Sequence, residues 1–168
     1  LRNPLIMQDV TDVFNGCEFK AFAGVVESGG KVLTIAVKDC ASQSRKFFDD
    51  MVKFAQSVGS KGLGYLRWVD GEIQSPIAKF LSDDILTSLK EIGNVGNGDV
   101  MFFIADESSQ AMEIGGHVRD ELGKRLDLID SSVFKFCWIV DFPMFEKDEI
   151  TGNIEFSHNP FSMPQGGM

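Results

Sequence analysis

"VMFFIA" at residues 100–105 decides the fold of this 168-residue chain, because apolar side chains would point to both faces of a strand built from it. Such a strand belongs in the centre of a sheet. Before it, residues 82–93 (SDDILTSLKEIG) predict a short helix with a Ser82 cap, acidic residues in the first turn and Gly93 as a stop. After it, a second amphipathic helix is predicted by the spacing of Ala111, Ile114, Gly115, Val118, Leu122 and Leu126.

Two further stretches favour antiparallel strands. Residues 19–26 (FKAFAGVV) and 31–37 (KVLTIAV) are rich in β-branched and aromatic residues, and the small residues between them predict a β-hairpin. Residues 63–76 (LGYLRWVDGEIQSP) predict a strand, a turn at Asp70 and Gly71, and a short return strand.

A longer helix is predicted over residues 42–59 (SQSRKFFDDMVKFAQSVG). Ser42 or Ser44 can cap its start, and Gly59 suits the left-handed position after its end. One face of this helix carries apolar residues at helical spacing: Phe47, Met51, Phe54, Ala55 and Val58.

Near the end of the chain, residues 134–142 (FKFCWIVDF) predict a strand that Pro143 stops, with residues 152–156 (GNIEF) as its antiparallel neighbour. Hairpins mixed with helices indicate an α+β fold with a mainly antiparallel sheet, not a doubly wound parallel one. The predicted core contains Phe47, Met51, Phe54, Val100, Phe102, Val118 and Leu122.

Length and charge narrow the class of protein. The chain fits one domain, or one domain and part of another. Its net charge of −9, from 25 acidic and 16 basic residues, argues against a stand-alone nucleic-acid binder. No apolar run approaches the ~20 residues of a membrane helix, and the opening LRNPLIMQDV has no features of a secretory signal. We expect a piece of a longer cytosolic protein.

Candidate chemical groups are few and scattered. Cys17, Cys40 and Cys137 are far apart and form no C-x-x-C motif, so buried free thiols are expected rather than a disulfide or zinc site. The glycines of residues 92–99 (IGNVGNGD) follow a helix and precede a strand, which is typical of a plain loop and not of a phosphate-binding loop. Asp141 and Glu146 are equally compatible with surface groups and with acid–base partners.

The two histidines differ in setting. His117 lies within a predicted helix, where a partly buried structural role is favoured. His158 lies in the Pro-rich stretch SHNPFSMP. On composition and periodicity alone, His158 is equally compatible with a binding group and with a loose loop end.

Five stretches taken together give a resemblance to a known family. They are LRNPL (1–5), KGLGYLRW (61–68), SPIAKFL (75–81), GDVMFFIAD (98–106) and WIVDFPMFE followed by SHNPFSMP (138–146 and 157–164). In order and spacing the chain resembles an internal part of bacterial-type aspartyl-tRNA synthetase. The resemblance covers nearly the whole chain.

The resemblance implies an order of domains. Residues 1–16 would connect from the catalytic core, 17–130 would form the insertion called the GAD domain, and 131–168 would supply strands of the class II catalytic core. The GAD fold it implies is a two-layer sandwich with a mainly antiparallel sheet. The aspartate-pocket loop would be residues 157–164, in which His158 stands at the family's substrate-binding histidine. Asn159 stands where many members have a second histidine and receives no role, whereas Pro160 and Phe161 would shape the loop.

The resemblance also implies a reaction and its partners. The parent enzyme, a homodimer in the cytoplasm, would activate L-aspartate with ATP and Mg²⁺ and transfer it to tRNA. Residues for catalysis, for ATP or for a metal have no counterpart in this chain, so the fragment alone should be inactive and bind nucleic acid poorly. Two alternatives are a non-catalytic GAD accessory domain of a tRNA-dependent amidotransferase B subunit and an independent domain binding a small ligand or a protein. Whether the parent also charges asparagine tRNA stays open.

Overall fold

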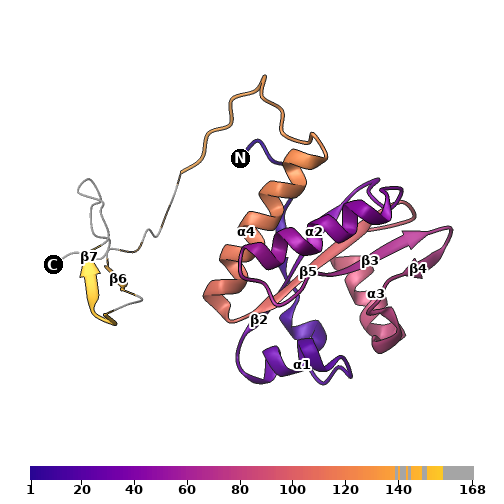
Figure 1. Cartoon of the computed structure of the whole chain (residues 1–168), viewed down its shortest axis with the longest axis horizontal. Helices are drawn as coiled ribbons and strands as arrows, with labels where there is room; N and C mark the ends of the chain where they lie inside the picture. Colours follow the sequence, from indigo (N-terminus) through magenta and orange to yellow (C-terminus); the bar gives the residue numbers. More distant parts are fainter. Residues whose placement is uncertain (139, 141–142, 144, 149–150, 157–168) are drawn as a thin grey trace. The chain divides into compact units, whose positions relative to one another are not determined.

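The structure is a computed structural model that describes residues 1–138, 140, 143, 145–148 and 151–156. Its larger unit is Arg2–Val133, and Phe134–Met168 belong to a second unit together with Leu1. The larger unit contains a twisted sheet and the helices labelled α1 to α4 (Figure 1).

Five strands form the sheet of the larger unit, in the order β1 (Met7–Asp9), β2 (Lys31–Val37), β5 (Val100–Asp106), β3 (Gly64–Val69) and β4 (Glu72–Gln74). All four neighbouring pairs are antiparallel. β5 lies in the middle, with Val37 of β2 opposite Val100 and Lys31 opposite Asp106. Residues 100–104 have no exposed surface, which confirms the prediction of a central strand that is apolar on both faces.

Helices cover both faces of this sheet. α2 (Arg45–Ser57) and α4 (Ser108–Arg125) pack on the face that carries Val100, Phe102 and Ile104. α1 (Lys20–Glu27) and α3 (Asp83–Ile92) pack on the face of Met101 and Phe103, together with two 3₁₀ helices, Thr11–Phe14 and Ala78–Phe80. The α+β fold with a mainly antiparallel sheet is confirmed. The unit has one more helical layer than the two-layer sandwich expected from the resemblance.

The starts of α2 and α3 and the turn between β3 and β4 lie where the local sequence predicted them. The Ser44 hydroxyl accepts a hydrogen bond from the amide of Phe47, and the Ser82 hydroxyl accepts one from Ile85, so both helices begin at serine caps. Asp70 and Gly71 both have positive φ, as a two-residue hairpin between β3 and β4 requires.

The predicted core is largely confirmed, with a shift on α2. Met51, Val100, Phe102, Val118 and Leu122 are fully buried. Phe47 and Phe54 are only partly buried at the edge of the cluster, because the helix turns its neighbour Phe48 toward the sheet.

The predicted hairpin over residues 19–37 is wrong in its first strand, which is helix α1. This helix buries Phe22 against Phe14 and Phe103, with ring centroids 4.9 and 6.0 Å away. Gly29, at φ +78°, follows the helix, and the amide of Gly30 donates to the carbonyl of Val25. The small residues therefore end a helix rather than turn a hairpin.

The predicted strand at residues 134–142 is also wrong in its described part, since residues 134–138 and 140 have no strand structure. Phe134, Phe136 and Trp138 are 87, 92 and 94% exposed. A strand needs a hydrogen-bonded neighbour, and this segment is paired with none of the described strands. Residues 154–156 (β7, Ile154–Phe156) pair instead with β6 (Phe145–Lys147), in an antiparallel hairpin of the second unit.

Candidate functional site

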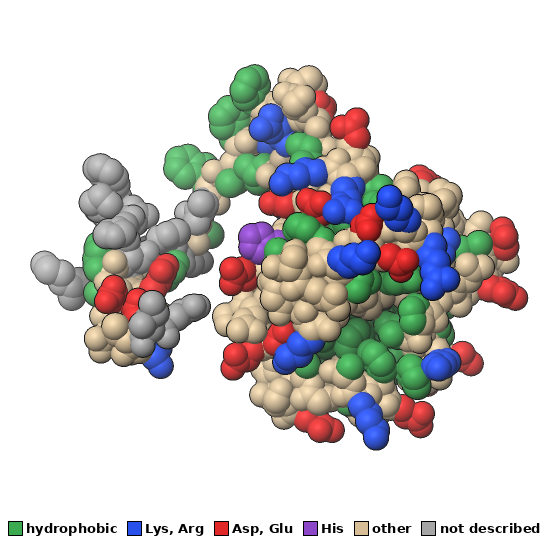
Figure 2. Space-filling view, in the orientation of Figure 1, with side chains coloured by type: hydrophobic (Ala, Val, Ile, Leu, Met, Phe, Trp, Pro, Cys, Tyr) green, Lys and Arg blue, Asp and Glu red, His purple; other side chains and the backbone are tan. Residues whose placement is uncertain are grey.

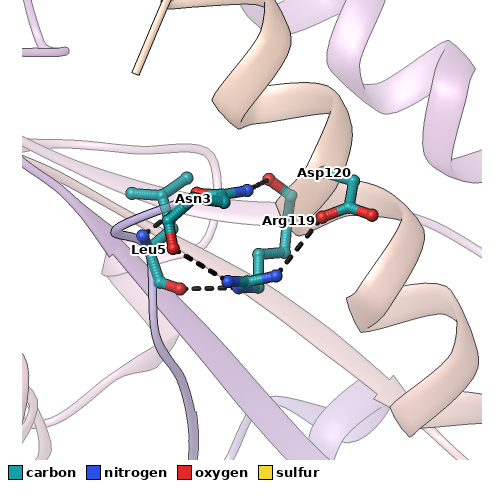
Figure 3. Close-up of polar contacts among 4 residues, drawn as sticks. All are labelled: Asn3, Leu5, Arg119 and Asp120. Atoms are coloured by element: carbon teal, nitrogen blue, oxygen red, sulfur yellow. Dashed lines mark hydrogen bonds and ion pairs between the residues drawn. The ribbon is translucent and has the colours of Figure 1, made fainter. Parts of the chain in front are cut away.

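The first residues of the chain are tied to helix α4 by reciprocal hydrogen bonds (Figure 3). Arg119 donates from Nε to the carbonyl of Leu5 at 2.6 Å and from Nη2 to the carbonyl of Asn3 at 3.0 Å. Asn3 donates back from Nδ2 to the carbonyl of Arg119 at 2.9 Å, across 116 residues of chain. A guanidinium that grips two carbonyls at once holds the segment in one orientation as well as in place.

The outgoing chain is fixed at the same end of α4. The Leu128 amide donates to the carbonyl of Gly123 at 2.9 Å. A Cβ added at Gly123 would lie 2.5 Å from Nδ2 of Asn3, so a larger residue there would have to displace the Asn3 side chain. Leu5 and Leu128 line one hollow of about 400 Å³. We call Asn3, Leu5, Arg119, Gly123 and Leu128 the joint.

An apolar cavity of about 520 Å³ lies between α1 and the start of β3. Phe22, Val25 and Ile77 contribute apolar walls, and Lys61 contributes the one cationic side chain of its lining. The Lys61 ammonium lies 3.5 Å from Oδ1 of Asp106, whose Oδ2 is buried without a hydrogen-bond partner. The lining is mainly apolar with one charged side chain, and it has no pair of titratable groups that could act as acid and base. The cavity therefore suits ligand binding rather than catalysis.

Asp99 organises the loops where β2 ends and β5 begins. Its carboxylate accepts hydrogen bonds from Lys38 Nζ at 2.9 Å, from the Asp39 amide at 3.0 Å and from the Gly96 amide at 2.8 Å. Burial raises the pKa of Asp99, but the hydrogen bonds from Lys38, Gly96 and Asp39 outweigh it, so the pKa lies below its ordinary value of 3.8. These donors belong to the protein itself, which makes the role structural.

The predicted aspartate-pocket residue, His158, lies outside the described residues, as do Asn159, Pro160, Phe161 and Asp141. Glu146, the other carboxylate considered, is exposed in β6. The structure therefore leaves the pocket prediction untested.

The prediction of a partly buried His117 is wrong. Its side chain is 54% exposed, and Nε2 lies 3.9 Å from a carboxylate oxygen of Glu113 one turn earlier (Figure 2, purple). The reason is the angular position of residue 117 on α4, whose buried face is formed by Ala111, Ile114, Gly115, Val118 and Leu122.

The cysteines follow the expectation of buried thiols only in part. Cys40 is buried, and burial raises the pKa of its thiol to about 11 although the Arg67 charge opposes this, so it is a poor nucleophile. Cys17 is half-buried, with its Sγ 3.7 Å from the carbonyl of Phe19. Cys137 is exposed, against the expectation.

The described residues do not fit an ATP–Mg²⁺ site. Within them, no three His, Cys, Asp or Glu side chains are placed to hold a metal ion. Three described arginines have partners within the protein: Arg67 donates to the carbonyl of Ala41, Arg119 to the carbonyls of Asn3 and Leu5, and Arg125 to Glu121. Figure 2 shows basic and acidic side chains interspersed over the face that it presents. Among the residues that the structure describes, no helix has both the length and the apolar character needed to span a membrane.

Comparison with known proteins identifies the family to which this fold belongs. The family model described as "GAD domain" matches residues 22–114, from α1 to the middle of α4 and more than half of the chain. The chain belongs to the GAD domain family. The match includes the buried strands β2 and β5 and most of the lining of the cavity beside α1, whereas Asn3, Arg119 and Gly123 of the joint lie outside it.

Longer relatives align with the GAD domain and with its flanks. The "Aspartate--tRNA(Asp/Asn) ligase" of Rickettsia felis is 48% identical over 100% of this chain and 28% of the relative. The proteins of the same name from Rickettsia prowazekii and Ehrlichia ruminantium are 47 and 46% identical, also over 100% of the chain. The chain thus spans less than a third of the length of these relatives.

One solved structure, "Hypothetical protein PH0730 from Pyrococcus horikoshii OT3", is similar at 20% identity and a TM-score of 0.40, over 60% of this chain and 58% of that chain. A likeness of this size carries no argument about function.

The joint is the feature that sequence reasoning missed. LRNPL was one of the stretches that carry the resemblance, but no role was predicted for Asn3. Its partner stands 116 residues away, and neither spacing nor composition links the two. A glycine at residue 123 in the last turns of a predicted helix was the available signal, because helix interiors disfavour glycine.

Proposed function

We propose that the chain is the GAD insertion and part of the catalytic core of an aspartate–tRNA ligase. The observation that carries the proposal is the 46–48% identity to ligases of that name over the full chain, including residues 131–168. An accessory domain of an amidotransferase, or a free-standing GAD domain, would not be expected to match such ligases in that last segment. The alternatives are therefore not favoured.

The proposed domain order keeps residues 1–16 as the connection from the core, 17–130 as the GAD insertion and 131–168 as returning core. An insertion leaves and rejoins its host through neighbouring segments. The joint supports this order, because the chain before β1 and the chain after α4 meet on the last turns of one helix. β1 itself extends the GAD sheet as an edge strand.

In the proposed reaction the aspartate carboxylate attacks the α-phosphate of ATP and pyrophosphate leaves, which gives aspartyl-adenylate. A hydroxyl of tRNA then attacks the aspartyl carbonyl, and AMP leaves. Positioning of the reactants and neutralisation of phosphate charge by cations, Arg and Mg²⁺, carry such a step. Because the described residues do not assemble such a site, we assign these groups to the remainder of the parent enzyme, a cytoplasmic homodimer. The names of the relatives support a parent that charges both tRNA(Asp) and tRNA(Asn).

Within this chain, we assign the aspartate pocket to the loop 157–164 and its contact to His158. The assignment rests on the motif SHNPFSMP following WIVDFPMFE. An imidazole that donates a hydrogen bond to the substrate carboxylate contributes roughly 1.5–3 kcal/mol as a charge-assisted bond.

Charging assays with the full-length enzyme test the proposal. Purified enzyme, ATP, Mg²⁺ and labelled aspartate should attach aspartate to tRNA(Asp), and transcripts of tRNA(Asn) should be charged with aspartate as well. Attachment of another amino acid in place of aspartate, or no attachment at all, contradicts the proposed function.

A further inference from the structure

The apolar cavity beside α1 is open because two positions on its wall carry no side chain. Gly24 of α1 and Gly62 before β3 both line it, and a Cβ added at either glycine would meet no atom within 4 Å. Glycine in the middle of a helix costs stability relative to alanine, and no close contact at Gly24 requires it. The fold thus keeps a hollow that a larger residue could fill. We propose that this cavity binds a small molecule with an apolar body and one carboxylate group.

The deepest part of the cavity suits the apolar body of such a ligand. Its lining residues Phe22, Leu63 and Ile77 are only 5, 7 and 8% exposed. The ring of Phe19, another lining residue, lies edge-on to Phe22 with the centroids 4.8 Å apart, and it stacks on Phe80 with the centroids 5.5 Å apart. Because these rings hold one another in place, the apolar surface exists before a ligand binds.

Lys61 supplies the charge that selects a carboxylate. Among the described lining residues it is the one charged side chain, and none is acidic. Its ammonium lies 3.5 Å from Oδ1 of Asp106, but the Lys61 side chain is 83% exposed, so this ion pair contributes little to stability. The long, flexible stem of lysine lets the ammonium turn from Asp106 toward a ligand at small cost.

The carboxylate of Asp106 does not face an anion bound in the cavity. Successive side chains of a strand point to opposite faces of the sheet, and Ala105 of β5 lines the cavity. Asp106, the next residue, therefore points to the other face, as does Ile104, which packs in the cluster of α2 and α4. Its Oδ1 also accepts a hydrogen bond from the amide of Glu107 at 2.9 Å, so it keeps a partner when Lys61 turns away.

The size of the cavity favours a small molecule over a protein partner. Its volume of about 520 Å³ lies in the range of roughly 300–1,000 Å³ that is typical of small-molecule sites. A protein partner would need about 800 Å² of surface on this side, with an apolar centre. The large apolar side chains exposed in the described part of the larger unit are Ile6, Phe80, Ile92 and Met112, and none of them lines the cavity. The apolar surface is therefore concentrated inside the hollow.

Two helical glycines provide a variant that fills the cavity and its matched control. Gly24→Leu places a side chain in the cavity without a clash at its Cβ. Gly116→Leu, in α4, likewise has no atom within 4 Å of the new Cβ, but Gly116 does not line the cavity. Both changes replace a helical glycine by a residue that favours helix, so neither should lower the Tm.

A second pair of variants tests the charge. Lys61→Met removes the ammonium and keeps an apolar stem, whereas Lys61→Arg keeps a positive charge at the same place. Lys53→Met is the control, because Lys53 is also exposed, at 76%, and lies 4.0 Å from a carboxylate oxygen of Asp50, away from the cavity lining.

The experiment is isothermal titration calorimetry of the full-length protein with 2-naphthoate and with the uncharged 2-naphthamide, with thermal melting alongside. For the wild type we expect a Kd on the order of 100 μM for 2-naphthoate. The Kd for 2-naphthamide should be about fivefold weaker, as for the loss of one exposed charged contact. Gly24→Leu should weaken both probes by about tenfold or more, because its side chain occupies the site. Lys61→Met should abolish the preference for 2-naphthoate, Lys61→Arg should retain it, and both controls should match the wild type.

Three results would overturn the inference. Binding of 2-naphthoate to Gly24→Leu as tight as to the wild type would place the probe elsewhere on the protein. Equal affinities of the wild type for the two probes would remove the selection of a carboxylate. Absence of binding, together with a lower Tm in Gly24→Leu than in Gly116→Leu, would show that a protein segment already fills the cavity. Failure of the proposed function looks different, because it would appear as absent aspartate-dependent exchange in the wild-type enzyme, whereas this experiment measures binding alone.

Discussion

Replacement of Asp99 by asparagine should destabilise the larger unit by an amount that the structure allows to be worked out. The carboxylate is 9% exposed and accepts three hydrogen bonds, from Lys38 and from the amides of Asp39 and Gly96. Asparagine can keep the bond from Asp39 through its carbonyl oxygen, but its NH₂ group then faces the two donors that Oδ2 accepted. The charge-assisted bond from Gly96 accounts for roughly 1.5–3 kcal/mol.

The Lys38 pair adds less, because the Lys38 side chain is 56% exposed and such pairs contribute about 0–1 kcal/mol. We therefore expect Asp99→Asn to lower the free energy of unfolding by about 1.5–4 kcal/mol at neutral pH. Urea denaturation of the chain, followed by circular dichroism, measures this difference. Asp70→Asn, at an exposed turn position with positive φ that asparagine tolerates, is the control and should stay within about 0.5 kcal/mol.

The pH dependence of the stability difference between wild type and Asp99→Asn provides a second test. Because the pKa of Asp99 is lowered in the folded state, its contribution is fully present above the ordinary value of 3.8. That contribution is lost as the pH falls through the lower folded pKa. The difference between wild type and variant should therefore be constant from about pH 7 to pH 5 and shrink at about pH 3. A difference below about 0.5 kcal/mol at neutral pH, or one that stays constant on acidification, would refute the reasoning.

Three other predictions concern the core, the fragment and the proposed pocket. Phe102→Ala, at a fully buried position, should cost about 3–5 kcal/mol in urea unfolding. Phe134→Ala, at a position 87% exposed, should change little, and equal effects of the two would contradict the assigned core. The isolated chain should show no pyrophosphate exchange and bind tRNA with a Kd above about 1 μM at physiological salt, because its net charge is −9. His158→Ala in the full-length enzyme should weaken aspartate use by about one to two decades with an unchanged Tm, and unaltered aspartate kinetics would exclude the pocket role.

The parts of the fold that could be predicted are those with local causes. The serine cap before α2, the turn at Asp70 and Gly71 and the apolar run of β5 each arise from neighbouring residues, and each has its predicted place. Helix α1 was predicted as a strand because valine and phenylalanine favour strands. Burial of Phe22 between Phe14 and Phe103 overrides that preference, and Phe103 is distant from it in sequence.

Local signals in the sequence do not show which strands pair with each other in a sheet. Residues 134–142 have strong strand propensity, yet in the described residues they find no strand to pair with. β1 went unpredicted because three residues carry too little periodicity, and its place depends on β2.

The candidate site likewise has one part that a local motif predicted and one part formed by residues distant in sequence. A family motif points to His158, which lies outside the described residues. For the joint, the helical Gly123 was the signal in the sequence, but the pairing of Asn3 with Arg119 could not be predicted because 116 residues separate them. Only the folded backbone brings them within hydrogen-bonding distance.

The central claim, that this chain belongs to an aspartate–tRNA ligase, is tested most directly by pyrophosphate exchange in the purified full-length enzyme with each standard amino acid in turn. The account predicts exchange of label between pyrophosphate and ATP that depends on aspartate and is negligible with asparagine or glutamate. Exchange that depends on another amino acid, or none with aspartate in the presence of Mg²⁺, would contradict it.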